Sequence, residues 1–138
     1  EPATTAENVF QWVAAHLEYP GDARNPRGAL YALRSGKGDC TEFMYLFAAL
    51  CRANNIPARC IGGYVTDANA VLRARAFHHW AEYYQNGTWR IADPERGILN
   101  DCYSHYIAFR IISETVKSPM LQYDRFRLKG EGLKAKMH

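Results

Sequence analysis

The spacing of hydrophobic residues changes along the chain from a helical to a strand-like period. Before Pro57, apolar residues recur every three or four positions, which is typical of amphipathic helices. A first helix is expected after the capping signal at Thr4-Thr5 and ends at Pro20-Gly21, and a short second helix is expected over 26–33. The most regular pattern predicts a third helix that begins at Cys40. Its apolar face consists of Phe43, Leu46, Phe47, Leu50 and Cys51.

Beyond Pro57, short runs of β-forming residues are separated by turns. Strands are predicted over 59–65, 76–85 and 88–93. Asn86-Gly87, between the last two, is a typical two-residue hairpin turn. The segment 101–116 fits both a strand and a helix, because it can be capped like a helix although its apolar residues alternate like a strand. Helices followed by an antiparallel sheet make an α+β domain.

Length and composition favour one domain that spans 1–138. The chain has 138 residues, of which 48% are hydrophobic and 22% charged, so it can bury a core without disulfides or a structural metal. The core is expected over about 6–128, with a last strand near 121–128, and 129–138 is expected to be a solvated tail.

Charge and hydropathy argue against two classes of partner. Lysines and arginines are scattered and the net charge is only +3, so no nucleic-acid binding is expected. No apolar run reaches the ~18 residues that a membrane helix needs, so no membrane insertion is expected. The chain begins with Glu1-Pro2 rather than Met. We therefore expect a removed leader or excision from a larger protein, and an extracytoplasmic location is slightly favoured.

Cys40 is a candidate nucleophile because of its place at a helix start. Asp39 and Glu42 have the spacing of a capping box, which puts Cys40 at the first helical position. Unpaired backbone N–H groups and the helix dipole stabilise a thiolate there, and the Cys40 N–H can help to hold an oxyanion. Gly36 and Gly38 allow another segment to approach this loop. By contrast, Cys51 and Cys60 lie within apolar patterns and are expected to pack.

Hairpin register distinguishes two adjacent histidines. A two-residue turn at Asn86-Gly87 pairs the strands so that Trp80 faces Asp93. Because side chains alternate between faces, His78 then shares a face with Trp80 and Asp93, and His79 lies on the other face. His78 and Asp93 become diagonal neighbours, close enough for the carboxylate to orient the imidazole. A bulge in either strand would reverse this assignment.

Three segments, in order, resemble the transglutaminase-like superfamily. They are Gly-x-Cys at 38–40, Ile-Pro-Ala-Arg at 56–59 followed by Gly62-Gly63-Tyr64, and His-x-Trp-x-Glu at 78–82 followed by Trp-x-x-x-Asp-Pro at 89–94. The likeness runs from about the first helix to Pro94. It implies a papain-like core with a catalytic Cys-His-Asp triad, in which Cys40 is the nucleophile, His78 the base and Asp93 the orienting acid. No metal or organic cofactor is implied.

Other residues have less definite roles under this resemblance. His79 stands where the family often has a small residue, which leaves an accessory role open. The oxyanion donor is not placed by any motif; Trp12 and Tyr19 are candidates, although a core role is the stronger expectation for both. Substrate contacts are expected around the loop 66–75, Tyr64 and Trp80.

The resemblance implies acyl transfer through a thioester on an amide bond of a protein or peptide substrate. Hydrolysis is slightly favoured, because the short chain lacks the large extra domains of animal cross-linking enzymes and water needs no dedicated acceptor site. Protein-glutamine transglutaminase activity with an amine acceptor is the first alternative. A non-enzymatic binding module with the same fold is the second.

Overall fold

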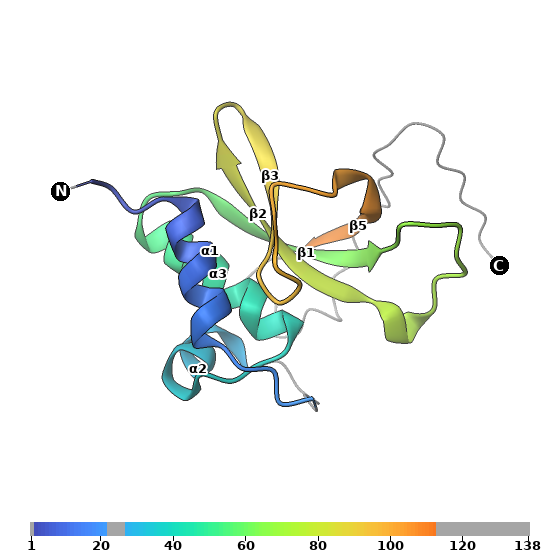
Figure 1. The fold of residues 1–138 in the computed structure, drawn as a ribbon, viewed down its shortest axis with the longest axis horizontal. Helices are drawn as coiled ribbons and strands as arrows, with labels where there is room; N and C mark the ends of the chain where they lie inside the picture. Colours follow the sequence, from blue (N-terminus) through green and yellow to red (C-terminus); the bar gives the residue numbers. More distant parts are fainter. Residues whose placement is uncertain (1, 22–26, 113–138) are drawn as a thin grey trace.

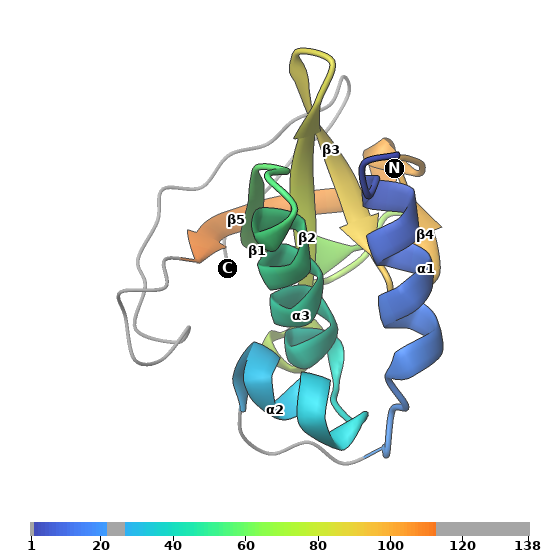
Figure 2. The same ribbon diagram turned by 90° about the vertical axis from the view of Figure 1, so that its left-hand side faces the viewer.

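Helices come first along the chain and a β-sheet follows. The computed structural model describes residues 2–21 and 27–112. The helices are α1 (Ala6–His16), α2 (Gly28–Ser35) and α3 (Cys40–Ala53). The strands are β1 (Ala58–Val65), β2 (His78–Gln85), β3 (Thr88–Asp93), β4 (Ile98–Leu99) and β5 (Tyr106–Ile112). The three helices gather on one side of the sheet, so the fold is α+β as the sequence predicts (Figures 1 and 2).

The five strands form one antiparallel sheet in the order β4-β3-β2-β1-β5. β1 therefore lies between β2 and β5, and the last strand of the described chain returns to the first. The β2–β3 hairpin has the predicted register, in which Gln85 pairs with Thr88 and Glu82 with Ile91. Asn86 and Gly87 both have positive φ angles, of 52° and 81°, as a two-residue hairpin turn requires.

Each face of the sheet packs into its own core. The face toward the helices includes Cys60, Ala81, Tyr83 and Ala92, which pack with α1 and α3 side chains such as Val13 and Phe47. The opposite face carries a smaller cluster of Ile61, Trp80, Ile91 and Tyr106. Consecutive residues of β2 therefore enter different layers of the molecule, and this alternation later separates the two histidines.

Several predicted boundaries shift by a few residues. The strand expected from position 76 begins at His78, because 74–76 form a short 3₁₀ turn. The segment with two possible structures contains another 3₁₀ turn at Tyr103–His105 and then β5, since its alternating apolar residues pair with β1. The strand expected near 121–128 and the tail expected at 129–138 lie outside the described residues.

Gly63 allows a close approach between β1 and β5. The β1–β5 register shifts between Gly62 and Gly63. A Cβ atom at Gly63 would overlap the carbonyl oxygen of Ile107 and would lie 2.8 Å from Cη2 of Trp80. A side chain at this position would therefore push on backbone on one side and on a buried ring on the other.

We expect Gly63→Ala to lower the free energy of unfolding by about 1–3 kcal/mol or more, because overpacking here displaces a backbone carbonyl. Urea denaturation of the 138-residue chain measures the change. Gly87→Asn is the control, since nothing lies within 4 Å of a Cβ at Gly87 and asparagine tolerates its positive φ. Equal unfolding midpoints for Gly63→Ala and wild type would contradict this account of the close approach.

Candidate active site

The start of α3 has the predicted capping box. The Asp39 carboxylate accepts a hydrogen bond of 2.8 Å from the Thr41 backbone N–H, and Glu42 Oε2 accepts one of 3.3 Å from the Asp39 N–H. Glu42 Oε1 also accepts from the Arg27 N–H at 2.8 Å, which ties α2 to α3. Cys40 is the first helical residue, so its thiol lies at the positive end of the helix dipole, where the backbone N–H of Cys40 has no partner within the helix.

A second segment approaches the loop before Cys40, as its glycines predict. The Glu18 N–H donates to the Gly36 carbonyl at 2.8 Å, and the Gly38 N–H donates to the Glu18 carbonyl at 3.2 Å. The chain that follows α1 therefore runs beside the entrance to α3. These backbone hydrogen bonds fix the loop that carries Cys40.

Two carboxyl groups adjoin the thiol at this helix start, and their pKa values differ. Burial, together with the neighbouring Asp39 carboxylate, raises the pKa of Glu42 to about 7. Burial also works against the charge of Asp39, but hydrogen bonds with Glu42 and Thr41 outweigh it and hold the pKa of Asp39 below its usual range. Near neutral pH the pair therefore carries less negative charge than two free carboxylates.

His78 and Asp93 meet on the sheet face that the hairpin register predicts. His78 Nε2 lies 2.8 Å from Asp93 Oδ2, and Asp93 is only 1% exposed. The same oxygen accepts a 2.8 Å hydrogen bond from the Tyr106 hydroxyl, and Arg96 Nε lies 3.9 Å away. Burial favours the neutral imidazole, but the bonds to Asp93 and Cys40 outweigh it and raise the pKa of His78 to about 9.

Sequence reasoning did not find Tyr106. Its contact with Asp93 joins β5 to β3 although two strands lie between them in the sheet. The residue lies in the segment whose structure the pattern left open, and no local spacing relates it to Asp93. Only the topology brings the two together.

His79 lies on the helix-facing side of β2, and there it contacts the cysteine. His79 Nδ1 is 3.9 Å from Cys40 Sγ. Burial and the positive charge of His78 lower the pKa of His79 to about 4. The thiol thus lies beside two imidazoles: it touches His79, and it is close enough to His78 to raise the pKa of that residue.

Comparison with known proteins identifies the family of this chain. The family model described as the transglutaminase-like superfamily matches residues 1–94. The chain belongs to the transglutaminase-like superfamily. The match covers the same part of the chain as the motif resemblance. At the level of the family, membership indicates a cysteine-dependent enzyme.

Two crystal structures resemble this superfamily member. One is a protein of Cytophaga hutchinsonii that has been proposed to be a cysteine protease, with 29% identity and a TM-score of 0.60 over 75% of this chain. The other is a TGase, with 20% identity and a TM-score of 0.54 over 71% of this chain, which shows the shared fold. The chain spans 34% and 27% of those two proteins. No curated protein matches the sequence.

Trp80 and Tyr64, the two aromatic residues expected to contact substrate, have different surroundings. Trp80 is 1% exposed, stacks on His78 with ring centroids 6.2 Å apart, and has no hydrogen-bond partner for Nε1 among the described residues. Tyr64 is buried and packs edge-on against Phe77 and Phe109. Both rings pack against the residues around them, and their role as substrate contacts stays a prediction.

The expectation that Trp12 and Tyr19 belong to the core is wrong. Trp12 is 45% exposed and Tyr19 is 53% exposed. Trp12 stacks on His16 along α1, with centroids 4.4 Å apart, and Tyr19 follows the residue that pairs with Gly36 and Gly38. Their role as oxyanion donors stays a prediction.

The remaining cysteines support the distinction drawn from the sequence. Cys51 and Cys60 are fully buried, and burial raises the pKa of their thiols to about 12 and about 11. Both therefore stay protonated at neutral pH. Cys40 is only partly buried and lies at the helix start.

One group among the described residues has the proximity that metal binding needs. Ligand atoms of His78, Asp93 and Glu95 all lie within 4.8 Å of one another. His78 Nε2 and Asp93 Oδ2 already bond to each other, so an ion would have to displace that hydrogen bond. We therefore assign no metal site there.

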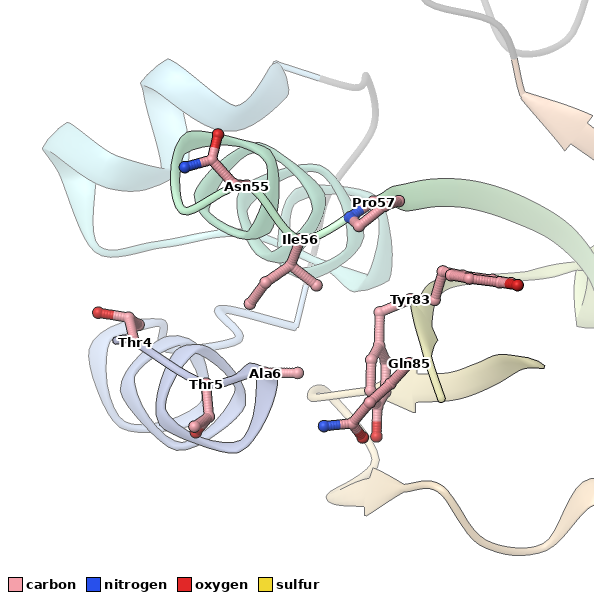
Figure 3. Close-up of a pocket in the computed structure, with 9 residues that line it drawn as sticks. Thr4, Thr5, Ala6, Asn55, Ile56, Pro57, Tyr83 and Gln85 are labelled. Atoms are coloured by element: carbon pink, nitrogen blue, oxygen red, sulfur yellow. The ribbon is translucent and has the colours of Figure 1, made fainter. Parts of the chain in front are cut away.

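A pocket with a volume of about 240 Å³ lies between the start of α1, the segment after α3 and the end of β2 (Figure 3). It is lined by Thr4, Thr5, Ala6, Asn55, Ile56, Pro57, Tyr83, Tyr84 and Gln85. This pocket adjoins the end of α3, whereas Cys40 begins that helix about 20 Å away.

Among the described residues, no helix has both the length and the apolar character that crossing a bilayer demands.

The two histidines should titrate in opposite directions from 6.5. We expect the His78 imidazole to titrate near pH 9 and His79 near pH 4 in an NMR titration of the ring protons. Because its folded-state pKa is raised, the contribution of His78 to stability is complete below pH 6.5 and is lost as the pH rises through about 9. His78→Gln and His79→Gln assign the two signals. Two ordinary titrations near pH 6.5 would contradict the burial and hydrogen bonding described here.

Proposed function

We propose that this chain catalyses acyl transfer from an amide or peptide bond through a thioester on Cys40. His78 is the proposed proton carrier, and Asp93 orients it. The observation that carries the proposal is the 2.8 Å bond between His78 and the buried Asp93, beside a thiol at a helix start. The substrate class is a protein or peptide, in keeping with the neighbour that has been proposed to be a cysteine protease.

Activation of the thiol follows from the charges around it. Only the thiolate attacks a carbonyl carbon, so the proton must go to a nearby base. His78 has a pKa of about 9, so its ring is protonated at neutral pH. Asp93 occupies His78 Nε2, which leaves Nδ1 as the nitrogen that exchanges the proton with Cys40. The resulting pair is a thiolate beside an imidazolium.

His79 is a poorer candidate for the base, although its Nδ1 lies 3.9 Å from Cys40 Sγ. A base with a pKa of about 4 does not hold a proton at neutral pH. A carboxylate also orients His78 through a direct hydrogen bond, and Asp93 bonds to no other imidazole among the described hydrogen bonds. The proton therefore goes to His78.

The reaction then has two halves. Cys40 sulfur forms a bond to the carbonyl carbon, and the backbone N–H of Cys40 is placed to stabilise the oxyanion at the helix start. His78 gives its proton to the leaving amine as the carbon–nitrogen bond breaks, which leaves a thioester. Water then attacks with His78 as the base and yields a carboxylic acid, while an amine attacking in the same way yields a new amide.

For the breakdown of the thioester we favour hydrolysis, and transamidation is the alternative. The 29% identical neighbour has been proposed to be a cysteine protease, whereas likeness to the TGase at 20% identity concerns the fold. A binding module without chemistry is less consistent with the chain, because Cys40, His78 and Asp93 are all present and the last two are bonded.

We expect Cys40→Ala and His78→Gln to lower turnover of a peptide library by about 10³-fold or more, because each removes a group that bond exchange requires. Asp93→Asn should retain partial activity, since it weakens orientation and leaves the nucleophile. Intact-mass spectrometry should detect an acyl adduct on wild type and none on Cys40→Ala. Cys51→Ala is the matched control, because that thiol is buried and protonated.

Product analysis separates the two reactions. Free acid and released amine without a conjugate indicate hydrolysis, whereas a conjugate formed with an added primary amine indicates transamidation. Full turnover by His78→Gln would refute the assignment of the base. Failure of wild type to form any adduct with the library or with a thiol-reactive probe would favour the binding module.

A further inference from the structure

The ring of His79 is held in a fixed place by its neighbours on the sheet. Gly62 lies between His79 on β2 and Arg110 on β5 in the register. A Cβ atom at Gly62 would lie 2.8 Å from the Phe77 ring, so the glycine leaves the space that this ring occupies. Phe77 packs edge-on against His79 at 5.3 Å between centroids, and Arg110 lies over the Phe77 ring at 4.9 Å.

This packing directs one nitrogen of His79 toward the nucleophile. Nδ1 lies 3.9 Å from Cys40 Sγ, which is close to the outer limit for a hydrogen bond to sulfur. An imidazole nitrogen that carries hydrogen can donate to a thiolate, and a hydrogen bond to a charged acceptor is stronger than one between neutral groups. The contact therefore has a chemical use beyond packing.

We propose that His79 is a further catalytic residue, which donates a hydrogen bond from Nδ1–H to the Cys40 thiolate and so stabilises it. This inference rests on the proposed function, in which Cys40 is the nucleophile. His79 neither gains nor loses a proton in the reaction. His78 alone transfers the proton, and His79 stabilises the thiolate.

The charges around His79 are consistent with a neutral donor. His78 on β2 and Arg110 on β5 add positive charge, Asp39 at the start of α3 adds negative charge, and burial has the largest effect. The pKa of His79 falls to about 4, so the ring is neutral near neutral pH. A neutral ring keeps one N–H and does not compete with His78 for the proton of Cys40.

The hydrogen bond matters most when sulfur carries charge. Sulfur loses its charge when it forms the thioester, and it recovers the charge when water or an amine breaks the carbon–sulfur bond. A donor to the thiolate therefore favours both the resting enzyme and the departure of sulfur in the second half. Loss of the donor should slow release of the acyl group and let the thioester accumulate.

The test compares His79→Leu with His79→Asn in the full chain. Leucine removes the donor, whereas the side-chain amide of asparagine places an N–H near the position of Nδ1. The rate of Cys40 alkylation by iodoacetamide is measured against pH, with the labelled cysteine identified by peptide mass. We expect the midpoint to move upward by about one pH unit in His79→Leu, and His79→Asn to stay near wild type.

Three outcomes would overturn the inference. They are an unchanged alkylation profile in folded His79→Leu, a failure of His79→Asn to restore the wild-type profile, and a loss of turnover in His79→Asn as complete as in His78→Gln. Circular dichroism checks folding. If His79→Leu does not fold, His79→Gln replaces it, because its amide lies one bond further from the backbone and does not match Nδ1.

Alkylation also distinguishes this failure from failure of the proposed function. The assay needs no substrate, and it reports on the thiol directly. If His78→Gln leaves the profile of Cys40 unchanged, the proposed proton exchange is wrong. If the alkylation profile of Cys40 changes in His78→Gln but not in His79→Leu, the proposed function is retained and the inference about His79 is wrong.

Discussion

One buried carboxylate oxygen joins the parts of the site that come from different strands. Asp93 Oδ2 receives His78 from β2 and the Tyr106 hydroxyl from β5, with Arg96 nearby. An ionised carboxylate at 1% exposure would be costly without such partners. The hydrogen bonds that stabilise the charge therefore also orient the imidazole, so folding of the far face of the sheet and arrangement of the site depend on the same contacts.

The helix start places a thiol in an environment with opposing charges. Asp39 is ionised and would repel a thiolate, but the positive end of the helix dipole and a charged His78 offset that repulsion. Glu42 contributes less negative charge than an ordinary carboxylate because its pKa is raised to about 7. The capping box thus begins the helix at Cys40 without surrounding the sulfur with two full negative charges.

Local chemistry explains which parts of the molecule were predictable. The capping box at Asp39 and the hairpin turn at Asn86-Gly87 act over a few residues, so the helix start and the His78–Asp93 face followed from the sequence. The contacts of Tyr106 with Asp93 and of His79 with Cys40 depend on sheet order and on which face the helices cover. No pattern within either segment specifies those choices, and exposure of Trp12 and Tyr19 depends on the same tertiary packing.

The turn between β2 and β3 has a consequence for how this domain tolerates changes in length. Surface turns commonly accept insertions, and nothing lies close to Gly87. Yet the turn sets the pairing that brings Asp93 to His78 at the other end of both strands. A single inserted residue that shifts this pairing would place the Asp93 carboxylate on the other face of the sheet. The geometry of the site therefore constrains the length of an exposed loop that does not contact it.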